Sequence, residues 1–235
     1  MAGKPTVEEG LPDWFATFAD MMTLLMTFFV LLFSMATLDP VKMADLAASM
    51  EKNLVGSKQP REKIKTQSQI NKEVLATIDK MDMEEYAKVS HSPKGTSITI
   101  DSRFAYGVGN ADLKAEILPF LDSLVPIMAS RGNKFPIAVE GHTDSDPTFG
   151  AIAVRYPTNW ELSSARAASV VRYLSAQGVP ASRLRAVGFA DQVPYGTTWA
   201  QSRVGVSVEA VNAANSTDEL KSQNRRVEIT FMQNG

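Results

Sequence analysis

Residues 14–38 read WFATFADMMTLLMTFFVLLFSMATL, an apolar run of 25 residues in which Asp20 is the only charged side chain. As an α-helix, the run would be about 37 Å long, which is enough to cross a bilayer with some tilt. A carboxylate inside such a span costs roughly 2.5–3.5 kcal/mol on insertion scales. One alternative is an Asp20 near the interface that reaches water, but its side chain is short for this. The sequence therefore predicts a transmembrane helix in which Asp20 binds or relays an ion.

One narrow stripe of this helix is small and polar. At about 100° per residue, Asp20 shares the stripe with Ala16, Thr23, Thr27 and Ser34. Small and hydroxylic residues suit close helix–helix contact in lipid, and ordinary helix packing would explain them without Asp20. Because the sequence has no second apolar run, we expect Asp20 to face a partner chain. The large apolar side chains cluster on the opposite side of the helix: Phe15, Phe18, Met22, Met26, Phe29 and Phe33.

The composition excludes several kinds of partner and site. A net charge of −2, from 24 basic and 26 acidic side chains, indicates no basic surface for nucleic acid. The chain has no cysteine, which excludes disulfides and thiolate metal sites. The sequence carries neither a nucleophile motif nor a metal-ligand motif, so we expect no enzyme, no cofactor and no bound metal.

A cleaved signal peptide is the alternative to a retained membrane helix, because Ser34-Met35-Ala36 resembles a small-x-small cleavage site. The preceding segment MAGKPTVEEGLPD is not basic, and the apolar run is long and interrupted by Asp20. We therefore expect a retained, single-pass anchor. Basic residues are more frequent after the span than before it, so charge counting alone would not put the N-terminus in the cytoplasm.

The remainder of the chain divides into three segments. Residues 39–55 contain an amphipathic stretch, Val41–Leu54, which predicts a short helix after Pro40 ends the span. Residues 56–93 are polar and mixed in charge, as is typical of a linker with some helix. Residues 94–235 alternate strands with helices, which predicts an α+β sandwich with helices on one face of a sheet.

The elements of this last segment follow from hydrophobic periodicity. Two prolines, Pro119 and Pro126, should bend or split the first of its helices. We expect strands at residues 96–101, 135–142, 184–189 and 226–232, and helices at residues 112–131 and 162–177.

Five motifs, in this order, resemble those of the OmpA-like peptidoglycan-binding domain: GHTD at 141–144, NWELS at 159–163, RAASV at 166–170, GV at 178–179 and NRRVEI at 224–229. Diaminopimelate in peptidoglycan carries an ammonium and a carboxylate on one centre, which calls for one anion and one guanidinium. By match to the motifs, the resemblance implies that Asp144 is this anion, Arg166 this guanidinium and Asn159 a hydrogen-bonding partner. Arg225 is a further candidate, although both it and Arg226 would also suit framework salt bridges.

The resemblance does not account for two long stretches of this segment or for the two histidines of the chain. Residues 145–158 and 196–223 are longer than the corresponding stretches of relatives, and we expect them to reshape or partly cover the wall site. His142 is expected to form a hydrogen bond at a strand end rather than to bind a metal. The only other histidine, His91, falls in the expected linker.

The N-terminal stretch LPDWFATFADMMTLLMTFFVLLFSM, residues 11–35, resembles the MotB/PomB family of flagellar stator B-subunits. The resemblance implies a homodimer enclosed by a ring of multi-pass, MotA/PomA-like A-subunits that contact the flagellar rotor. Asp20 would then be the ion-binding carboxylate, and Val41–Leu54 a plug that blocks ion flow. The C-terminal domain would bind peptidoglycan outside the bacterial inner membrane, which puts the N-terminus in the cytoplasm.

The transported cation and two alternative functions stay open at this point. A bare carboxylate suffices for protons, whereas sodium takes several oxygen ligands, which Thr23 and Thr27 would help to provide beside Asp20. These threonines and the resemblance to sodium-type members favour sodium. The first alternative is a passive, inner-membrane-anchored peptidoglycan tether, which leaves Asp20 unexplained. The second is the stator of a non-flagellar ion-driven motor.

Overall fold

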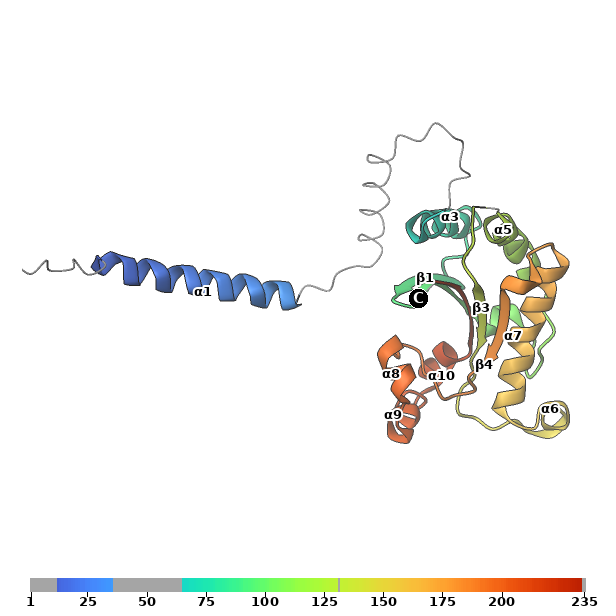
Figure 1. Cartoon of the computed structure of the whole chain (residues 1–235). Coiled ribbons are helices and arrows are strands. Elements are labelled where there is room, and N and C mark those ends of the chain that lie inside the picture. Colours follow the sequence, from blue (N-terminus) through green and yellow to red (C-terminus); the bar gives the residue numbers. More distant parts are fainter. Residues whose placement is uncertain (1–11, 36–64, 131, 234–235) are drawn as a thin grey trace, which may run out of the picture. The chain divides into compact units, whose positions relative to one another are not determined.

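The computed structural model describes residues 12–35, 65–130 and 132–233, and the chain divides into two compact units, Met1–Leu46 and Ala47–Gly235. The first unit contains helix α1 (Asp13–Met35; Figure 1). Its residues Trp14–Ser34 are long and apolar enough to cross a membrane, with a mean hydropathy of 1.9, and none is buried in this chain. A helix that is apolar apart from one narrow polar stripe and that is unburied requires lipid or partner helices around it.

The second unit is built on a five-stranded sheet in the order β1-β2-β5-β3-β4. Neighbouring strands pair antiparallel except β3 and β4, which are parallel and are joined by a crossover helix. The predicted strands are confirmed, with β5 matching residue for residue. The strands are β1 (Ala87–Ser92), β2 (Gly95–Asp101), β3 (Ile137–Gly141), β4 (Leu184–Gly188) and β5 (Arg226–Met232).

Three helices cover one face of this sheet: α3 (Gln67–Lys80), α5 (Leu118–Ala129) and α7 (Asn159–Ala176; Figure 1). Alternate residues of β5, namely Val227, Ile229 and Phe231, are fully buried against these helices. The residues between them turn to the opposite face, because side chains alternate along a strand. The predicted α+β sandwich is therefore confirmed.

The expected linker is wrong for its described residues, because they belong to the folded domain. Ile70, Val74 and Ile78 on α3 are buried in the core, and β1 pairs with β2 along its length. Thr66 caps α3 with a capping box. The domain thus starts before the predicted boundary at residue 94, since three apolar side chains spaced four apart bury a helix that is otherwise polar. Residues 56–64 and the expected plug helix, Val41–Leu54, lie outside the described residues.

The helix expected at residues 112–131 is shorter than predicted. A turn of 3-10 helix at Ala115–Ile117 leads into α5 (Leu118–Ala129). Pro119 lies in the first turn, where its missing N–H costs no helical hydrogen bond, and the helix continues through Pro126 as one element. The expected split therefore occurs at the helix start rather than at Pro126.

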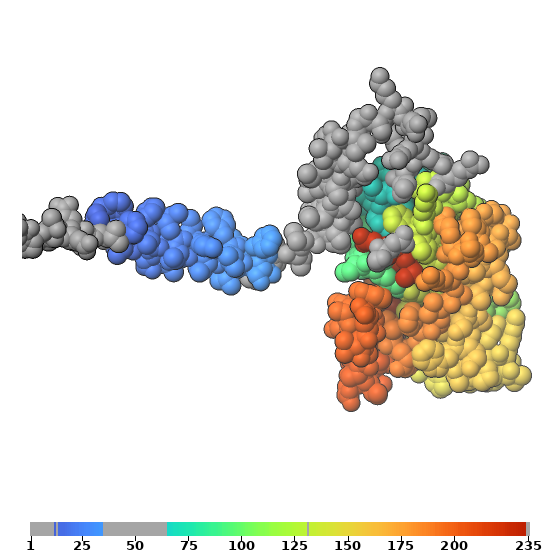
Figure 2. Space-filling model, viewed as in Figure 1, coloured from blue at the N-terminus to red at the C-terminus, as the bar shows by residue number. Residues whose placement is uncertain are grey.

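The two long stretches form additional short helices. Residues 145–158 contain α6 (Gly150–Arg155), and residues 196–223 contain α8 (Trp199–Val204), α9 (Val208–Ala213) and most of α10 (Asp218–Asn224). Figure 1 shows α8 and α10 on the side of the sheet opposite α7, and Figure 2 shows the orange-red segment gathered into one lobe. The second long stretch therefore approaches the sheet face that the core helices leave open.

Helix α7 packs so closely on β3 and β4 that no side chain fits between them at two positions. A Cβ atom on Gly141 would lie 2.1 Å from the carbonyl oxygen of Ser163, and one on Gly188 would lie 2.2 Å from Ser164 Oγ. Both glycines stand at the C-terminal ends of their strands. Their missing side chains therefore bring the N-terminal half of α7 close to the loop that follows β3.

We predict that Gly141→Ala lowers the free energy of unfolding by roughly 1–3 kcal/mol, because the new methyl group overlaps a backbone oxygen. Urea unfolding of the full chain in detergent, followed by tryptophan fluorescence, measures this. Gly107→Ala is the matched control, since its Cβ would meet only Asn110 Cβ at 3.7 Å. Equal stability of the two variants would contradict the close-approach argument.

Candidate functional site

Asp144 lies three residues beyond the end of β3, in a loop held by backbone hydrogen bonds. The N–H of His142 donates to the carbonyl oxygen of Arg226 at 3.0 Å, and that of Thr143 to the carbonyl oxygen of Ala190 at 2.8 Å. Ala190 has a positive φ of 49°, which is unusual for a residue other than glycine. These contacts fix the loop against both neighbouring strands, so Asp144 has a defined position.

The Asp144 carboxylate is already paired within the chain. Its Oδ2 accepts from Arg225 Nη1 at 2.5 Å, and its Oδ1 accepts from the backbone N–H of Asp146 at 3.3 Å. The Asp144 side chain is 12% exposed and that of Arg225 31%. An incoming ammonium group must therefore share the carboxylate with Arg225 or replace it.

Arg166 projects from α7 and is almost fully buried. Its Nε donates to the carbonyl oxygen of Asn110 at 3.0 Å, and its guanidinium carbon lies 5.3 Å from the ring centroid of Tyr106. Burial lowers the pKa of Arg166, while Tyr106 and Asp144 oppose this shift. Within the described residues neither Nη group makes a hydrogen bond, so an arginine fixed by its Nε keeps two donors for a carboxylate.

Asn159 is the first residue of α7, after the N-cap Thr158. Its Nδ2 donates to the carbonyl oxygens of Asp144 at 3.1 Å and of Asp146 at 2.9 Å. Asn159 therefore joins the start of α7 to the Asp144 loop. The structure thus brings both Asn159 and Arg225 into direct contact with Asp144, whose charge also acts on the pKa of Arg166.

The second long stretch supplies contacts that sequence reasoning missed. Lys221 Nζ pairs with Asp146 Oδ1 at 2.6 Å, and Asn215 Oδ1 accepts from the N–H of Ser145 at 3.2 Å. Asn215 is itself held by Asn224 Nδ2 at 2.9 Å. These residues brace the Asp144 loop from one side. The expectation that this stretch reshapes or partly covers the wall site stays a prediction, and these contacts show where it meets the Asp144 loop.

Arg226, His142 and His91 take different places in the domain. Arg226 is a buried framework residue: its Nε pairs with Glu228 Oε1 at 2.6 Å, and its Nη2 donates to the carbonyl oxygen of Val193 at 3.1 Å. The hydrogen bond expected of His142 at the strand end is made by its backbone N–H to the carbonyl oxygen of Arg226, whereas neither ring nitrogen has a partner with hydrogen-bond geometry among the described residues. His91 lies on β1, where its Nδ1 is 3.1 Å from Thr96 Oγ1.

The membrane residues form a regular row on α1. Thr23 Oγ1 donates to the carbonyl oxygen of Asp20 at 2.8 Å, and Thr27 Oγ1 donates to that of Leu24 at 2.9 Å. All three side chains of the proposed ion site, Asp20, Thr23 and Thr27, are exposed in this chain. Because each hydroxyl hydrogen is given to the helix backbone, the oxygen lone pairs stay free to contact a cation.

The chain matches known proteins at both ends. Residues 2–54 match a family described as membrane MotB of the proton-channel complex MotA/MotB, and residues 105–204 match the OmpA family. The chain is 29% identical to YtxE of Bacillus subtilis, over 93% of this chain and 88% of that protein. It is 23% identical to Motility protein B of the same organism, over 95% of this chain and 91% of that protein.

Two solved structures share the fold of the C-terminal domain. A MotB-like protein from Desulfovibrio vulgaris aligns with a TM-score of 0.58 and 22% identity, over 72% of this chain and 94% of that one. The cell wall anchor of the T6SS from Pseudomonas aeruginosa aligns with a TM-score of 0.53 and 27% identity, over 68% and 97%.

We predict that Asn159→Ala frees the Asp144 loop, because it removes both hydrogen bonds that tie the loop to α7. Hydrogen–deuterium exchange of the full chain in detergent should be faster in peptides that cover residues 144–149. A loss of about 2 kcal/mol in unfolding free energy should accompany it, at about 1 kcal/mol for each bond. The exposed Asn212 on α9 is the control, as Asn212→Ala should alter neither quantity. Unchanged exchange in Asn159→Ala would argue against this positioning role.

Proposed function

We propose that this chain, which is a MotB-like protein with an OmpA-like domain, is the B-subunit of an ion-driven motor stator. In this proposal, a cation crosses the inner membrane by way of Asp20 on α1, and the C-terminal domain binds peptidoglycan. The matches to a MotB family and to the OmpA family, in that order along one chain, support it. Peptidoglycan lies outside the inner membrane, so the N-terminus is cytoplasmic in this arrangement.

The single observation that carries wall binding is the Arg166 guanidinium, whose Nη groups have no partner among the described residues and on which the charge of Asp144 acts. Arg166 is anchored by its Nε and by the ring of Tyr106, while both Nη groups lack partners among the described residues. We assign the diaminopimelate carboxylate to these Nη groups and its ammonium to Asp144. Arg225 then acts as the internal partner that Asp144 gives up or shares, and Asn159 holds the loop.

Asp20 carries the second half of the proposal. A carboxylate in a membrane span is costly unless it faces protein or water and has a partner. The described side chains of α1 are all exposed in the single chain, so a homodimer inside a ring of A-subunits is the surrounding that we assign. The A-subunits in turn make the contact with the rotor. Cation binding at Asp20 neutralises its charge and biases the ring between two arrangements.

Sodium is the cation we favour. The hydroxyl oxygens of Thr23 and Thr27 point their lone pairs away from the backbone, and a hard cation takes several oxygen ligands. The matched N-terminal family is described as part of a proton-channel complex, which makes the proton the alternative.

A second candidate function is a stator or tether outside flagella. The likeness of the domain to the cell wall anchor of the T6SS favours it, because that protein anchors a different machine. A passive tether would use Asp144 and Arg166 but not Asp20. A non-flagellar motor would use both sites.

We predict that Asp20→Asn abolishes ion-driven motility, because an amide neither charges nor discharges, while membrane insertion stays normal. Swimming speed of cells that depend on this chain measures the effect, with Asp20→Glu as the carboxylate-retaining control.

In the parent strain, speed should rise with sodium concentration at fixed pH and persist with a protonophore. Normal swimming of the Asp20→Asn strain would leave the passive tether as the function of this chain. A swimming speed that does not depend on sodium would identify the proton as the transported cation.

We predict that Arg166→Lys weakens binding to purified sacculi by about 10–100-fold, because a lysine loses the paired donors that hold a carboxylate. Cosedimentation of the full chain in detergent with sacculi measures this, and circular dichroism checks the fold. Arg172→Lys is the matched control, since Arg172 is exposed on the same helix. Equal sedimentation of both variants would remove Arg166 from the wall site.

A further inference from the structure

The sheet face opposite α7 carries two carboxylates directly across from each other. Glu140 on β3 and Glu228 on β5 are register partners in the antiparallel pair, and Glu140 is buried. Like charges in directly opposed positions destabilise a sheet. Burial raises the pKa of Glu140, Lys94 acts against this rise, and Glu228 adds to it. This pair therefore needs a cation close by.

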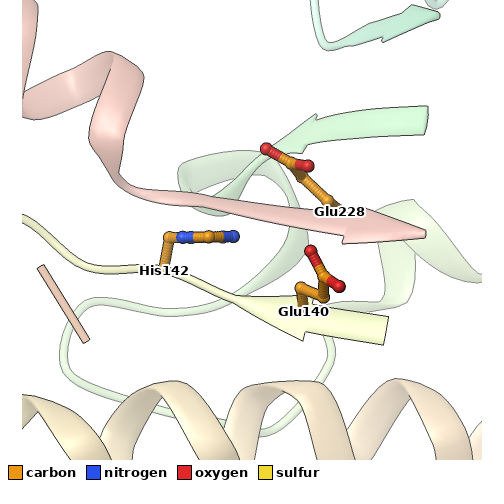
Figure 3. A group of neighbouring side chains, drawn as sticks. All are labelled: Glu140, His142 and Glu228. Carbon is orange, nitrogen blue, oxygen red and sulfur yellow. The ribbon is translucent and has the colours of Figure 1, made fainter. Parts of the chain in front are cut away.

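His142 completes the group. It follows Glu140 by two residues and shares its face of the sheet, and one ligand atom each from Glu140, His142 and Glu228 lies within 4.8 Å of the others. Figure 3 shows the His142 ring directed toward the two carboxylates. Three side chains of types that bind metals thus converge from two neighbouring strands.

The His142 ring is buried without a hydrogen-bonding partner. It is 1% exposed, and within the described part of the chain neither Nδ1 nor Nε2 is hydrogen-bonded. The ring stacks on Phe189, with centroids 5.3 Å apart and 14° between planes. Burial, with help from Arg226 and Lys94, lowers the pKa of His142, while the backbone of Val193 opposes this shift. A neutral imidazole binds a metal through its lone pair, and neither ring nitrogen has a partner with hydrogen-bond geometry among the described residues.

Two basic side chains balance the carboxylates, and one of them is replaceable. Lys94 Nζ contacts both carboxylate oxygens of Glu140, and Arg226 Nε pairs with Glu228. The Arg226 side chain is only 5% exposed, whereas that of Lys94 is 15% exposed and its Nζ lies 5.8 Å from the Trp199 ring centroid on α8. A divalent cation would therefore displace Lys94 and leave Arg226 in position.

We propose that Glu140, His142 and Glu228 form a zinc site in which Lys94 acts as the built-in counter-ion that the metal replaces. One imidazole and two carboxylates suit zinc, whose fourth position water would take, better than calcium or magnesium. Zinc–ligand bonds of about 2.0–2.2 Å bring ligand atoms to about 3.3–3.6 Å from one another in a tetrahedral site. Rotation of the three side chains would shorten their ligand-atom separations from within 4.8 Å to this distance. None of the three side chains is assigned to wall binding, although His142 lies two residues before Asp144 on the same loop, and zinc binding does not depend on the wall-binding function.

Zinc binding by the full, untagged chain in detergent tests this. After treatment with EDTA, the chain is dialysed against zinc chloride, and bound zinc is measured by mass spectrometry. We expect one zinc per chain, with affinity at least about tenfold weaker in Glu228→Gln, whose carboxylate is only partly buried. Lys94→Met should bind zinc more tightly, because it removes the competing ammonium. Tighter binding on loss of a neighbouring charge is a result that a purely structural role of Lys94 would not give.

Two controls keep the assignment specific. His91→Asn changes the only other histidine, and Glu209→Gln changes an exposed carboxylate on α9, so both should bind zinc like the parent. Cobalt(II) added instead of zinc should give the intense visible absorption of a four-coordinate site, and His142→Asn should lose it. Absence of stoichiometric zinc in the parent would overturn the proposal. Equal binding by Glu228→Gln, or a loss confined to His91→Asn, would overturn it as well.

Discussion

The contact between α7 and the ends of β3 and β4 governs the geometry of the C-terminal domain. Gly141 and Gly188 let Ser163 and Ser164 come to distances at which any side chain would collide. Because α7 begins at Asn159, the same approach brings its amide to the Asp144 loop and buries Arg166 beside Tyr106. The proposed site has one charged group on a loop and the other on a helix. The distance between the two groups is therefore set by how α7 packs on the strand ends.

The two faces of the sheet have different chemistry. One face is sealed by α3, α5 and α7 around an apolar core, whereas the other carries paired charges under the segment that contains α8. Buried ion pairs contribute little net stability, because desolvation offsets their attraction. What they supply here is a defined arrangement, in which Arg226 joins the sheet to the carbonyl oxygen of Val193. The residues of the second long stretch thus bear on both the charged face and the Asp144 loop.

Local patterns foretold some elements and missed others for physical reasons. Alternation in β5 and the motif around α7 are carried by neighbouring residues, so the strand, the helix and the gathering of Asp144, Asn159 and Arg225 were predictable. Some helix was expected in the segment that contains α3, but its burial in the domain was not, since three apolar side chains among mostly polar ones suffice to bury it. Lys221 and Asp146 are 75 residues apart, and nothing in the local sequence links them. The position of His142 beside Glu228 was not predictable either, because it comes from the pairing of β3 with β5 rather than from nearby positions.

In the proposed function, the Arg225–Asp144 pair makes attachment to the wall an exchange of partners. A ligand ammonium gains only the difference between its own bond to Asp144 and the internal bond it disturbs. In the proposed function, the affinity of one such site is then modest and its dissociation correspondingly quick. Firm attachment would require several domains bound to one sacculus at the same time, and a single domain would dissociate more readily.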